Sequence, residues 1–462
     1  MDKAKFNKKF ILGITLVSAM GGLLFGYDWV VIGGAKPFYE RFFDITNSPY
    51  LQGWAMSSAL IGCLVGAMAS GYLSDRFGRK RPLIISAALF TIAAIGTGAA
   101  NQFTSFIIFR LIGGLGIGLA SAISPMYIAE ISPAKMRGRL VSVNQLTIVI
   151  GILAAQIINY LIAESVPTGI SDNLILLSWN GQMGWRWMFW AGTVPALMFF
   201  IFSFFIPESP RFLAKSGKWK AAAAILEKIG GAHYAILEQK DIAETLHGTD
   251  SKIDWKVLSS KKLRPVLILG IVLAVFQQWC GINVIFNYAE EIFTSAGYSV
   301  GDMLFNIVIT GTVNLLFTFL AMRMVDSWGR RKLMLLGSIG LAVVYFMLGT
   351  SYFFELKGLA ILVLVMVAIA TYAMTLAPIT WVVLSEIFPN SVRGTAMAIA
   401  TTALWIACFV LTYTFPILNK MLSASGTFWL YSFICLMGFL FILRKLPETK
   451  GKSLEEIERL ES

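Results

Sequence analysis

One acidic residue lies inside a long apolar stretch near the start of the chain. The stretch reads GGLLFGYDWVVIGG over residues 21–34, and its acid is Asp28. An ionised side chain within a membrane is costly, so such residues are rare, paired and functional. Few other charges fall deep in an apolar stretch, and Arg110 is the candidate partner. A carboxylate at this place can bind and release a proton, and an adjacent arginine would respond to that change of charge.

The expected depths of Asp28 and Arg110 in a membrane agree. Asp28 lies about 18 residues, or roughly 27 Å, from the inner end of its predicted helix. Arg110 lies about seven residues, or roughly 10 Å, from the outer end of a helix that runs the other way. Pairing offsets part of the cost of burying each charge. The residues alone leave two interpretations open, a proton-coupling site and a static structural ion pair.

The composition indicates a polytopic membrane protein. Of 462 residues, 57% are hydrophobic and 14% are charged, and the mean hydropathy is +0.71. Soluble globular chains are about 45–50% apolar and about 25% charged. The net charge of +12 does not indicate a nucleic-acid partner, because the basic residues are confined to particular loops. We therefore expect a lipid bilayer, and no nucleic acid, around the chain.

The cysteines and histidines predict neither a metal site nor an enzyme. All four cysteines fall in apolar stretches without close-spaced pairs or a neighbouring histidine. His233 and His247 both lie in the long polar segment in the middle of the chain. No combination of nucleophile and base is evident, so we expect no catalytic residues, no metal and no cofactor.

Apolar windows of about 20 residues predict twelve membrane-spanning helices. They cover residues 10–33, 51–73, 82–100, 103–129, 140–163, 185–206, 265–292, 301–324, 333–353, 358–385, 394–417 and 426–444. An even number places both termini on one side, and basic clusters in alternate loops identify that side as the cytoplasm. The opposite loops have few basic residues, namely Lys36, Arg41, Lys357 and Lys420.

Two motifs occur twice in the chain. GYLSDRFGRKR at 71–81 returns as MRMVDSWGRRK at 322–332, and YIAEISPAKMRGR at 127–139 returns as LSEIFPNSVRG at 384–394. The two repeats have nearly the same spacing, which predicts two six-helix halves with a substrate site between them. The predicted parts are an N-terminal half at 1–206, cytoplasmic linker helices at 207–263, a C-terminal half at 264–446 and a cytoplasmic tail at 447–462.

With these motifs the chain resembles the sugar porter family of the major facilitator superfamily. PESPRFL at 207–213, QQWCGIN at 277–283 and PETKGKS at 447–453 add to the resemblance, which covers the whole chain. Its overall character is closest to bacterial D-xylose:proton symporters. The resemblance implies an all-α major facilitator fold in a bacterial inner membrane. It also implies import of a monosaccharide with a proton by alternating access, with the proton as coupling ion.

The resemblance also implies which residues bind the sugar and the proton. In sugar porters an aspartate at the position of Asp28 accompanies proton coupling, which favours that role for Asp28 and Arg110. Sugar recognition needs polar side chains and an aromatic face in a mostly apolar cavity. Gln277 and Asn283 can share a face only if Gly281 loosens their helix. The positions that match sugar contacts of the family are Gln145, Gln277, Gln278, Asn283, Asn314, Trp381 and Trp405.

Charged residues at matched positions of the two repeats predict a cytoplasmic gate. Arginine–carboxylate pairs between helix ends would hold the cytoplasmic side closed in one state and break in the other. The alternative is that these charges only set the membrane topology. The residues are Asp75, Arg79, Glu130, Arg137, Asp326, Arg330, Glu386 and Arg393.

Three positions depart from the expected pattern and leave the sugar open. Ile152 and Leu404 stand where the xylose symporters have glutamines, and Asn287 stands where the family usually has the first of two tyrosines. Such changes can move the preference among xylose, arabinose, glucose and related sugars. The alternatives to symport are a proton-independent uniporter and a membrane sugar receptor that binds without transport, with a membrane enzyme as a weaker third. We expect a monomer.

Overall fold

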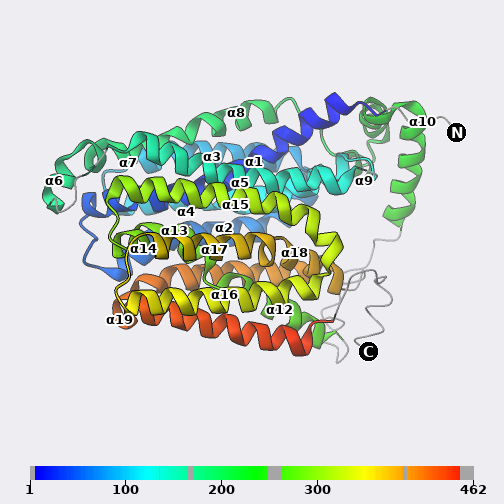
Figure 1. Ribbon diagram of the computed structural model, residues 1–462. Coiled ribbons are helices and arrows are strands. Elements are labelled where there is room, and N and C mark those ends of the chain that lie inside the picture. Colours follow the sequence, from blue (N-terminus) through cyan, green and yellow to red (C-terminus); the bar gives the residue numbers. More distant parts are fainter. Residues whose placement is uncertain are drawn as a thin grey trace. The chain divides into compact units, whose positions relative to one another are not determined.

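The protein is helical throughout the part that the structure describes. The computed structural model describes residues 6–134, 136–164, 166, 171–247, 263–388 and 393–447, and none of these residues forms a strand. Figure 1 shows long helices joined by short connections. Ten of the described helices are long and apolar enough to cross a membrane. The predicted all-α membrane class is therefore confirmed.

Most predicted spans form one continuous helix each. A continuous helix satisfies its own backbone hydrogen bonds, which a bilayer requires of any segment that crosses it. These helices are α1 (Lys8–Phe42), α2 (Pro49–Phe77), α3 (Lys80–Ala99), α4 (Phe103–Ile131), α5 (Arg137–Ile162), α15 (Val300–Trp328) and α16 (Arg330–Phe353).

The other predicted spans are either interrupted or merged into one helix. This explains why ten long helices correspond to twelve predicted spans. The sixth comprises α7 (Trp185–Ala191) and α8 (Thr193–Ser203), and the tenth comprises α17 (Leu359–Met374) and α18 (Leu376–Ile387). The last two form α19 (Arg393–Lys445), in which Ser423 has φ 60° and ψ 172° and marks the turn between them. The seventh has three pieces, α12 (Arg264–Trp279), α13 (Ile282–Asn287) and α14 (Ala289–Ser295).

Further helices occupy the connections. Before the sixth span lie α6 (Asp172–Leu177) and the π-helix η1 (Asn180–Gly184), and after it lie α9 (Pro210–Lys215) and α10 (Trp219–His247). The last two confirm the helices predicted in the linker. Ile229 of α10 packs in one apolar cluster with Ile11, Ile128 and Leu140, so this amphipathic helix covers the ends of α1, α4 and α5.

Packing divides the chain into two compact units. The first comprises Met1–Asp28, Gly62–Ile152 and Phe189–Lys252, and the second comprises Trp29–Ile61, Leu153–Met188 and Ile253–Ser462. In the first unit α3 packs against α4 and α8, and in the second α19 packs against α12 and α16. The division falls inside α1, α2 and α5, so it does not follow the sequence repeats. The predicted boundaries after 206, 263 and 446 stay a prediction.

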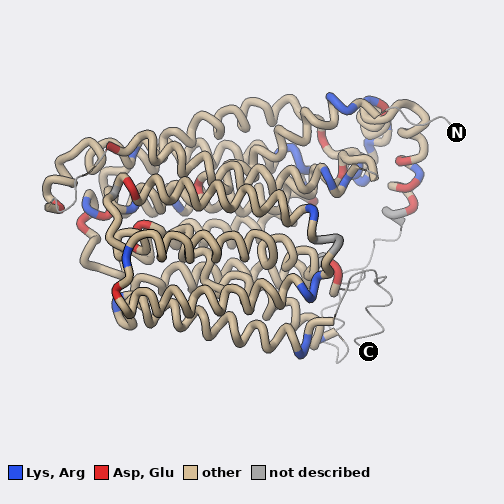
Figure 2. Tube along the Cα trace, viewed as in Figure 1, with Lys and Arg blue, Asp and Glu red and all other residues tan. Residues whose placement is uncertain are grey.

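Three basic residues predicted in outer loops lie in helices instead. Lys36 and Arg41 belong to α1, which continues to Phe42, and Lys420 belongs to α19. A hydropathy window ends where charged residues begin, whereas a helix can continue through charged residues. The charge of Lys36 is compensated by three carboxylates. Figure 2 shows the wider pattern, in which charges gather near helix ends and the middles of the helices carry few.

The break in the seventh span predicts a measurable sensitivity at Gly281. Its φ of 86° lies in the left-handed region, and an added Cβ would come within 2.9 Å of the Tyr431 ring. Gly281→Ala should lower the free energy of unfolding by about 1–2 kcal/mol from backbone strain alone. Gly13→Ala is the control, because Gly13 lies in α1 with open space around it. A thermal unfolding comparison in detergent that finds both variants equally stable would contradict this account of the break.

Candidate functional site

The structure brings Asp28 of α1 and Arg110 of α4 together. Nη1 of Arg110 donates to both carboxylate oxygens of Asp28, at 2.9 Å and 2.8 Å. Both residues belong to the first compact unit. The predicted pairing is therefore confirmed, and the agreement in depth that suggested it follows from the antiparallel course of α1 and α4.

The two side chains of this pair differ in burial. The Arg110 side chain is 3% exposed, and the ring of Phe189 lies 5.9 Å from its guanidinium. Its Nε has no hydrogen-bond partner, so Asp28 provides the compensation for its charge. The Asp28 side chain is 20% exposed. Gly113 lies beside the carboxylate, since a Cβ there would be 4.0 Å from both of its oxygens, an ordinary van der Waals distance. A buried cation thus depends on a carboxylate that is itself only partly buried.

The broken seventh span forms a chain of amides. Nδ2 of Asn283 donates to Oε1 of Gln278, and Nε2 of Gln278 donates to Oε1 of Gln277 at 2.5 Å. Nε2 of Gln277 then donates to the Tyr372 hydroxyl of α17 at 2.6 Å. The left-handed Gly281 lies between the two glutamines and Asn283, which confirms that a loosened helix lets them meet.

This amide chain suits a polyhydroxylated ligand. The three amides are buried, and they offer both donors and acceptors at fixed positions. The Tyr372 hydroxyl accepts from Gln277 and keeps its own proton to donate. Sugar hydroxyls likewise donate and accept, so they can extend or replace the links of such a chain.

The remaining predicted sugar residues have different surroundings. Asn314 of α15 is buried, and the buried Trp405 ring of α19 lies edge-on to Trp29 of α1 at 6.2 Å. Trp381 of α18 is 39% exposed. All of these belong to the second unit, whereas Gln145 of α5 belongs to the first and is exposed. The structure therefore joins Gln277, Gln278 and Asn283 directly, and the roles of all seven residues stay predictions.

Two of the departures from the family pattern are apolar core residues. Ile152 and Leu404 are 8% and 4% exposed. Asn287 ends α13, is 4% exposed, and its Oδ1 has no hydrogen-bond partner. A buried amide oxygen without a partner is costly unless a ligand or another state satisfies it. This position is therefore where we expect the sugar preference of this chain to differ from the family pattern.

The first unit contains a compact cluster of the predicted gate residues. Nη2 of Arg79 contacts Oε1 of Glu130 at 2.7 Å, and the hydroxyl of Ser209 donates to the other Glu130 oxygen. Glu208 accepts from the backbone amides of Arg79 at 2.8 Å and Lys80 at 3.3 Å. A carboxylate at this place satisfies free amides at the start of α3 and complements the helix dipole.

The second unit repeats one of these contacts. Nη2 of Arg330 lies 3.1 Å from Oε1 of Glu386, and these residues match Arg79 and Glu130 in the sequence repeat. Asp75 contacts Lys215 of α9 at 3.1 Å, and Nε of Arg137 donates to the backbone oxygen of Ala129. The side chains of Asp326 and Arg393 lie outside those that the structure describes. Each described arginine–carboxylate pair lies within a single unit.

Sequence reasoning missed several partners. Glu208 and Ser209 belong to the PESPRFL motif, which is a signal that identified the family but not their contacts. Tyr372 lies in an apolar helix with no local sign of a polar role. Lys36 is the largest omission, because it was assigned to a loop and is 2% exposed.

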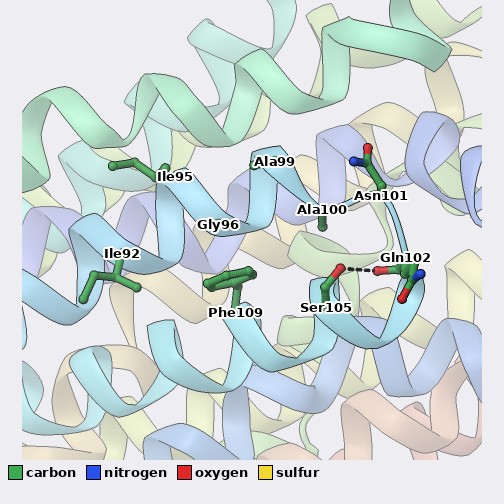
Figure 3. Close-up of a pocket in the computed structure, with 9 residues that line it drawn as sticks. All are labelled: Ile92, Ile95, Gly96, Ala99, Ala100, Asn101, Gln102, Ser105 and Phe109. Carbon is green, nitrogen blue, oxygen red and sulfur yellow. Dashed lines mark hydrogen bonds between the residues drawn. The ribbon is translucent and has the colours of Figure 1, made fainter.

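A separate cavity of about 570 Å³ lies where α3 and α4 meet at their connection. Figure 3 shows Phe109 and Ile92 along it, with Asn101, Gln102 and Ser105 at one end. None of the predicted sugar or proton residues lines this cavity. Its mostly apolar lining does not offer the amide pattern of the seventh span, so we do not assign the sugar site to it.

Comparison with known proteins identifies the family. A family model described as "Sugar (and other) transporter" matches residues 14–460. The D-xylose-proton symporter of Escherichia coli is 39% identical, over 99% of this chain and 96% of that protein. This chain belongs to the sugar transporter family. The arabinose-proton symporter of Bacillus subtilis is 40% identical, over 98% of this chain and 95% of that protein.

Solved structures agree with the sequence comparison. The inward open conformation of the E. coli xylose transporter XylE matches with a TM-score of 0.85 at 38% identity, covering 97% of this chain and 99% of XylE. The same major facilitator symporter bound to 6-bromo-6-deoxy-D-glucose matches with a TM-score of 0.80 at 38% identity, covering 99% of this chain and 100% of that one. The sugar transporter therefore has the major facilitator fold, and it is a multi-pass membrane protein.

The amide chain predicts that sugar affinity falls when the Tyr372 hydroxyl, the terminal acceptor of the chain, is removed. Tyr372→Phe removes that acceptor and leaves Nε2 of Gln277 unpaired, so sugar affinity should fall about five- to tenfold, or about 1 kcal/mol. Gln277→Ala removes the central link and should weaken binding more. Tyr50→Phe is the control, because Tyr50 is 61% exposed. Calorimetric titration of the purified variants checks this, and unchanged affinity in both site variants would refute the assignment.

The Arg79 cluster predicts that two neighbouring arginines differ in their contribution to the free energy of unfolding. Arg79→Ala leaves the partly buried Glu130 without its ion pair and should lower the free energy of unfolding by about 2–3 kcal/mol. Arg76→Ala is the matched control, since Arg76 lies three residues before Arg79, at the end of α2, and is exposed. Thermal unfolding of both variants in one detergent provides the comparison. Equal melting temperatures would argue against a cluster that holds this end together.

Proposed function

We propose that this chain imports a monosaccharide together with a proton by alternating access, and that Asp28 is the proton site. The observation that carries the proposal is the Asp28–Arg110 pair, in which a buried arginine depends on one partly exposed carboxylate. The family membership supports transport, and the names of both proton symporters among the relatives support proton coupling.

The pair supplies a simple coupling step. While Asp28 is ionised it holds Arg110, and the two charges compensate each other. Protonation of Asp28 removes the negative charge, so Arg110 loses its compensation and must find water or another acceptor. The two protonation states therefore favour different arrangements of α1 and α4. A proton shifts the conformational equilibrium by the difference in its affinity for those two states.

The substrate that fits the polar residues is a neutral pentose or hexose. The amide donors and acceptors match vicinal hydroxyls, and the predicted tryptophans Trp381 and Trp405 would offer an aromatic face to the C–H surface of a sugar ring. The relatives are named for xylose, arabinose and glucose, which spans both sugar sizes. No cofactor enters this proposal, because the proton gradient supplies the driving force. The chain would act as a transporter and not as an enzyme.

The remaining parts of the proposal concern orientation and gating. The basic loops support an orientation with both termini on the cytoplasmic side of a bacterial inner membrane, by the positive-inside rule. The Arg79–Glu130 and Arg330–Glu386 pairs would then lie on the cytoplasmic side and stabilise one of the two access states. We expect the working form to be a monomer.

Asp28→Asn separates coupling from binding. Asparagine keeps the size of the side chain but cannot gain or lose a proton, so proton-driven accumulation should fall to the level of passive equilibration. Sugar binding and exchange of sugar for sugar should persist, because Asp28 is not among the proposed sugar contacts. The measurement is uptake into proteoliposomes with and without an imposed proton gradient, together with counterflow in the same preparation.

The controls distinguish coupling from damage. Asp44→Asn changes an exposed acid beyond the end of α1 and should leave accumulation intact. A static structural pair predicts instead that Asp28→Asn loses folding or every transport mode together, since Arg110 stays buried and uncompensated. Accumulation that survives in Asp28→Asn would exclude Asp28 as the proton site. Wild-type sugar uptake that causes no alkalinisation of the medium would favour a uniporter.

A further inference from the structure

A buried lysine near the end of α1 is surrounded by three carboxylates. Nζ of Lys36 lies 3.2 Å from Oε2 of Glu40, 3.1 Å from Oε2 of Glu290 and 2.8 Å from Oε1 of Glu291. The lysine is 2% exposed, and its ammonium also lies 5.9 Å from the centre of the Tyr288 ring. This lysine cluster takes no part in the proposed sugar, proton or cytoplasmic sites.

The lysine cluster joins segments that are distant in the sequence. Lys36 and Glu40 lie one turn apart on α1, whereas Glu290 and Glu291 occupy the first turn of α14. Two further contacts extend the cluster to other helices of the same unit. Nε2 of Gln52 in α2 donates to Glu40 at 3.2 Å, and Nδ2 of Asn419 in α19 donates to Glu291 at 3.3 Å.

The contact between Lys36 and α14 can limit movement of α14, because α14 follows two backbone breaks. Between α12 and α14 the backbone leaves helical geometry twice, at Gly281 with φ 86° and at Tyr288 with φ −120° and ψ 27°. Short helices bounded by such breaks can change direction through a few backbone angles. The bonds from Lys36 to Glu290 and Glu291 connect the last of these pieces to α1.

Electrostatics favour two states of the lysine cluster. In one the lysine contacts its carboxylates, and in the other water separates and solvates the charges. A buried ammonium without partners is very unfavourable, and three carboxylates gathered in a mostly buried site depend on the ammonium to limit their mutual repulsion. When water enters, each group is solvated and the pairs can separate at much lower cost. Such a cluster stabilises a closed, dry arrangement and contributes little to an open, wet one.

We propose that Lys36 is a positioning residue of the transport cycle, whose ion pairs with Glu290 and Glu291 hold α14 against α1. They thereby close the sugar path at the end of α1 distal to its N-terminus. This inference rests on the proposed transport function, but its test requires neither sugar nor a proton gradient. Opening of the path requires these two pairs to break, while the Lys36–Glu40 pair within α1 can persist.

A cysteine reporter at Asn287 measures that opening. Asn287 is 4% exposed and lies just before α14, and the four natural cysteines are buried. The reporter Asn287→Cys is reacted with a membrane-impermeant maleimide in reconstituted vesicles, and the chain without the reporter gives the background. Addition of Lys36→Met should raise the labelling rate about tenfold or more, because the closed state loses both of its bridging pairs.

Matched variants separate bridging from general loss of charge. Glu291→Gln removes a bridging carboxylate and should also raise the rate. Glu40→Gln removes the partner on the same helix and should leave the rate within about twofold. Arg41→Met should also leave it unchanged, because the Asp172 partner of Arg41 is largely exposed. The exchange Lys36→Glu with Glu291→Lys keeps one ammonium among three carboxylates and should restore slow labelling.

The outcomes decide the proposal. Fast labelling in Lys36→Met and Glu291→Gln, with slow labelling in the exchange variant, supports it. An unchanged rate in Lys36→Met, or an equal rise in Glu40→Gln or Arg41→Met, would overturn it. If Lys36→Met does not fold, Glu291→Gln and the exchange variant give the same decision. A failure of the transport proposal is recognised separately, because Asp28→Asn is scored by uptake and these variants are scored by labelling.

Discussion

The cost of an unpaired charge in a membrane is the constraint on which the site depends. Arg110 is almost fully buried and is compensated by Asp28, and Lys36 is equally buried and is compensated by three carboxylates. In both cases a change in the partner's charge or hydration alters the stability of one arrangement. A transporter can use this sensitivity, because charge pairs that are stable only in a dry site distinguish its closed and open states.

Breaks in the membrane-spanning helices are a second feature on which the proposed site depends. Irregular backbone is tolerated at membrane depth only where protein or a cavity surrounds it. The seventh span meets this condition, because Cys280 and Ile282 on either side of Gly281 are fully buried. The break aligns two glutamines with Asn283, and the same break leaves α13 and α14 as short pieces. The proposed sugar contacts and the proposed movement of the path therefore share one segment.

The sequence repeat has a partial counterpart in the contacts. Arg79–Glu130 and Arg330–Glu386 are the same interaction at matched positions of the two halves. Glu208 and Ser209 add contacts to the first pair from the segment that follows the sixth span. The two sequence repeats therefore share an arginine–glutamate pair, and the segment after the sixth span adds partners to the first of them.

The sequence by itself determined the membrane class, the twelve spans, the repeat and the pairing of Asp28 with Arg110. Hydropathy and rare intramembrane charges are properties of local sequence, and a rare charge has few possible partners. Only the tertiary structure decided that Tyr372 ends the amide chain, that Glu208 binds the start of α3, and that Lys36 is buried. These contacts join segments far apart in the chain, and no periodicity or spacing encodes them. A lysine beside an apolar window looks like a loop residue until the fold brings carboxylates from another helix around it.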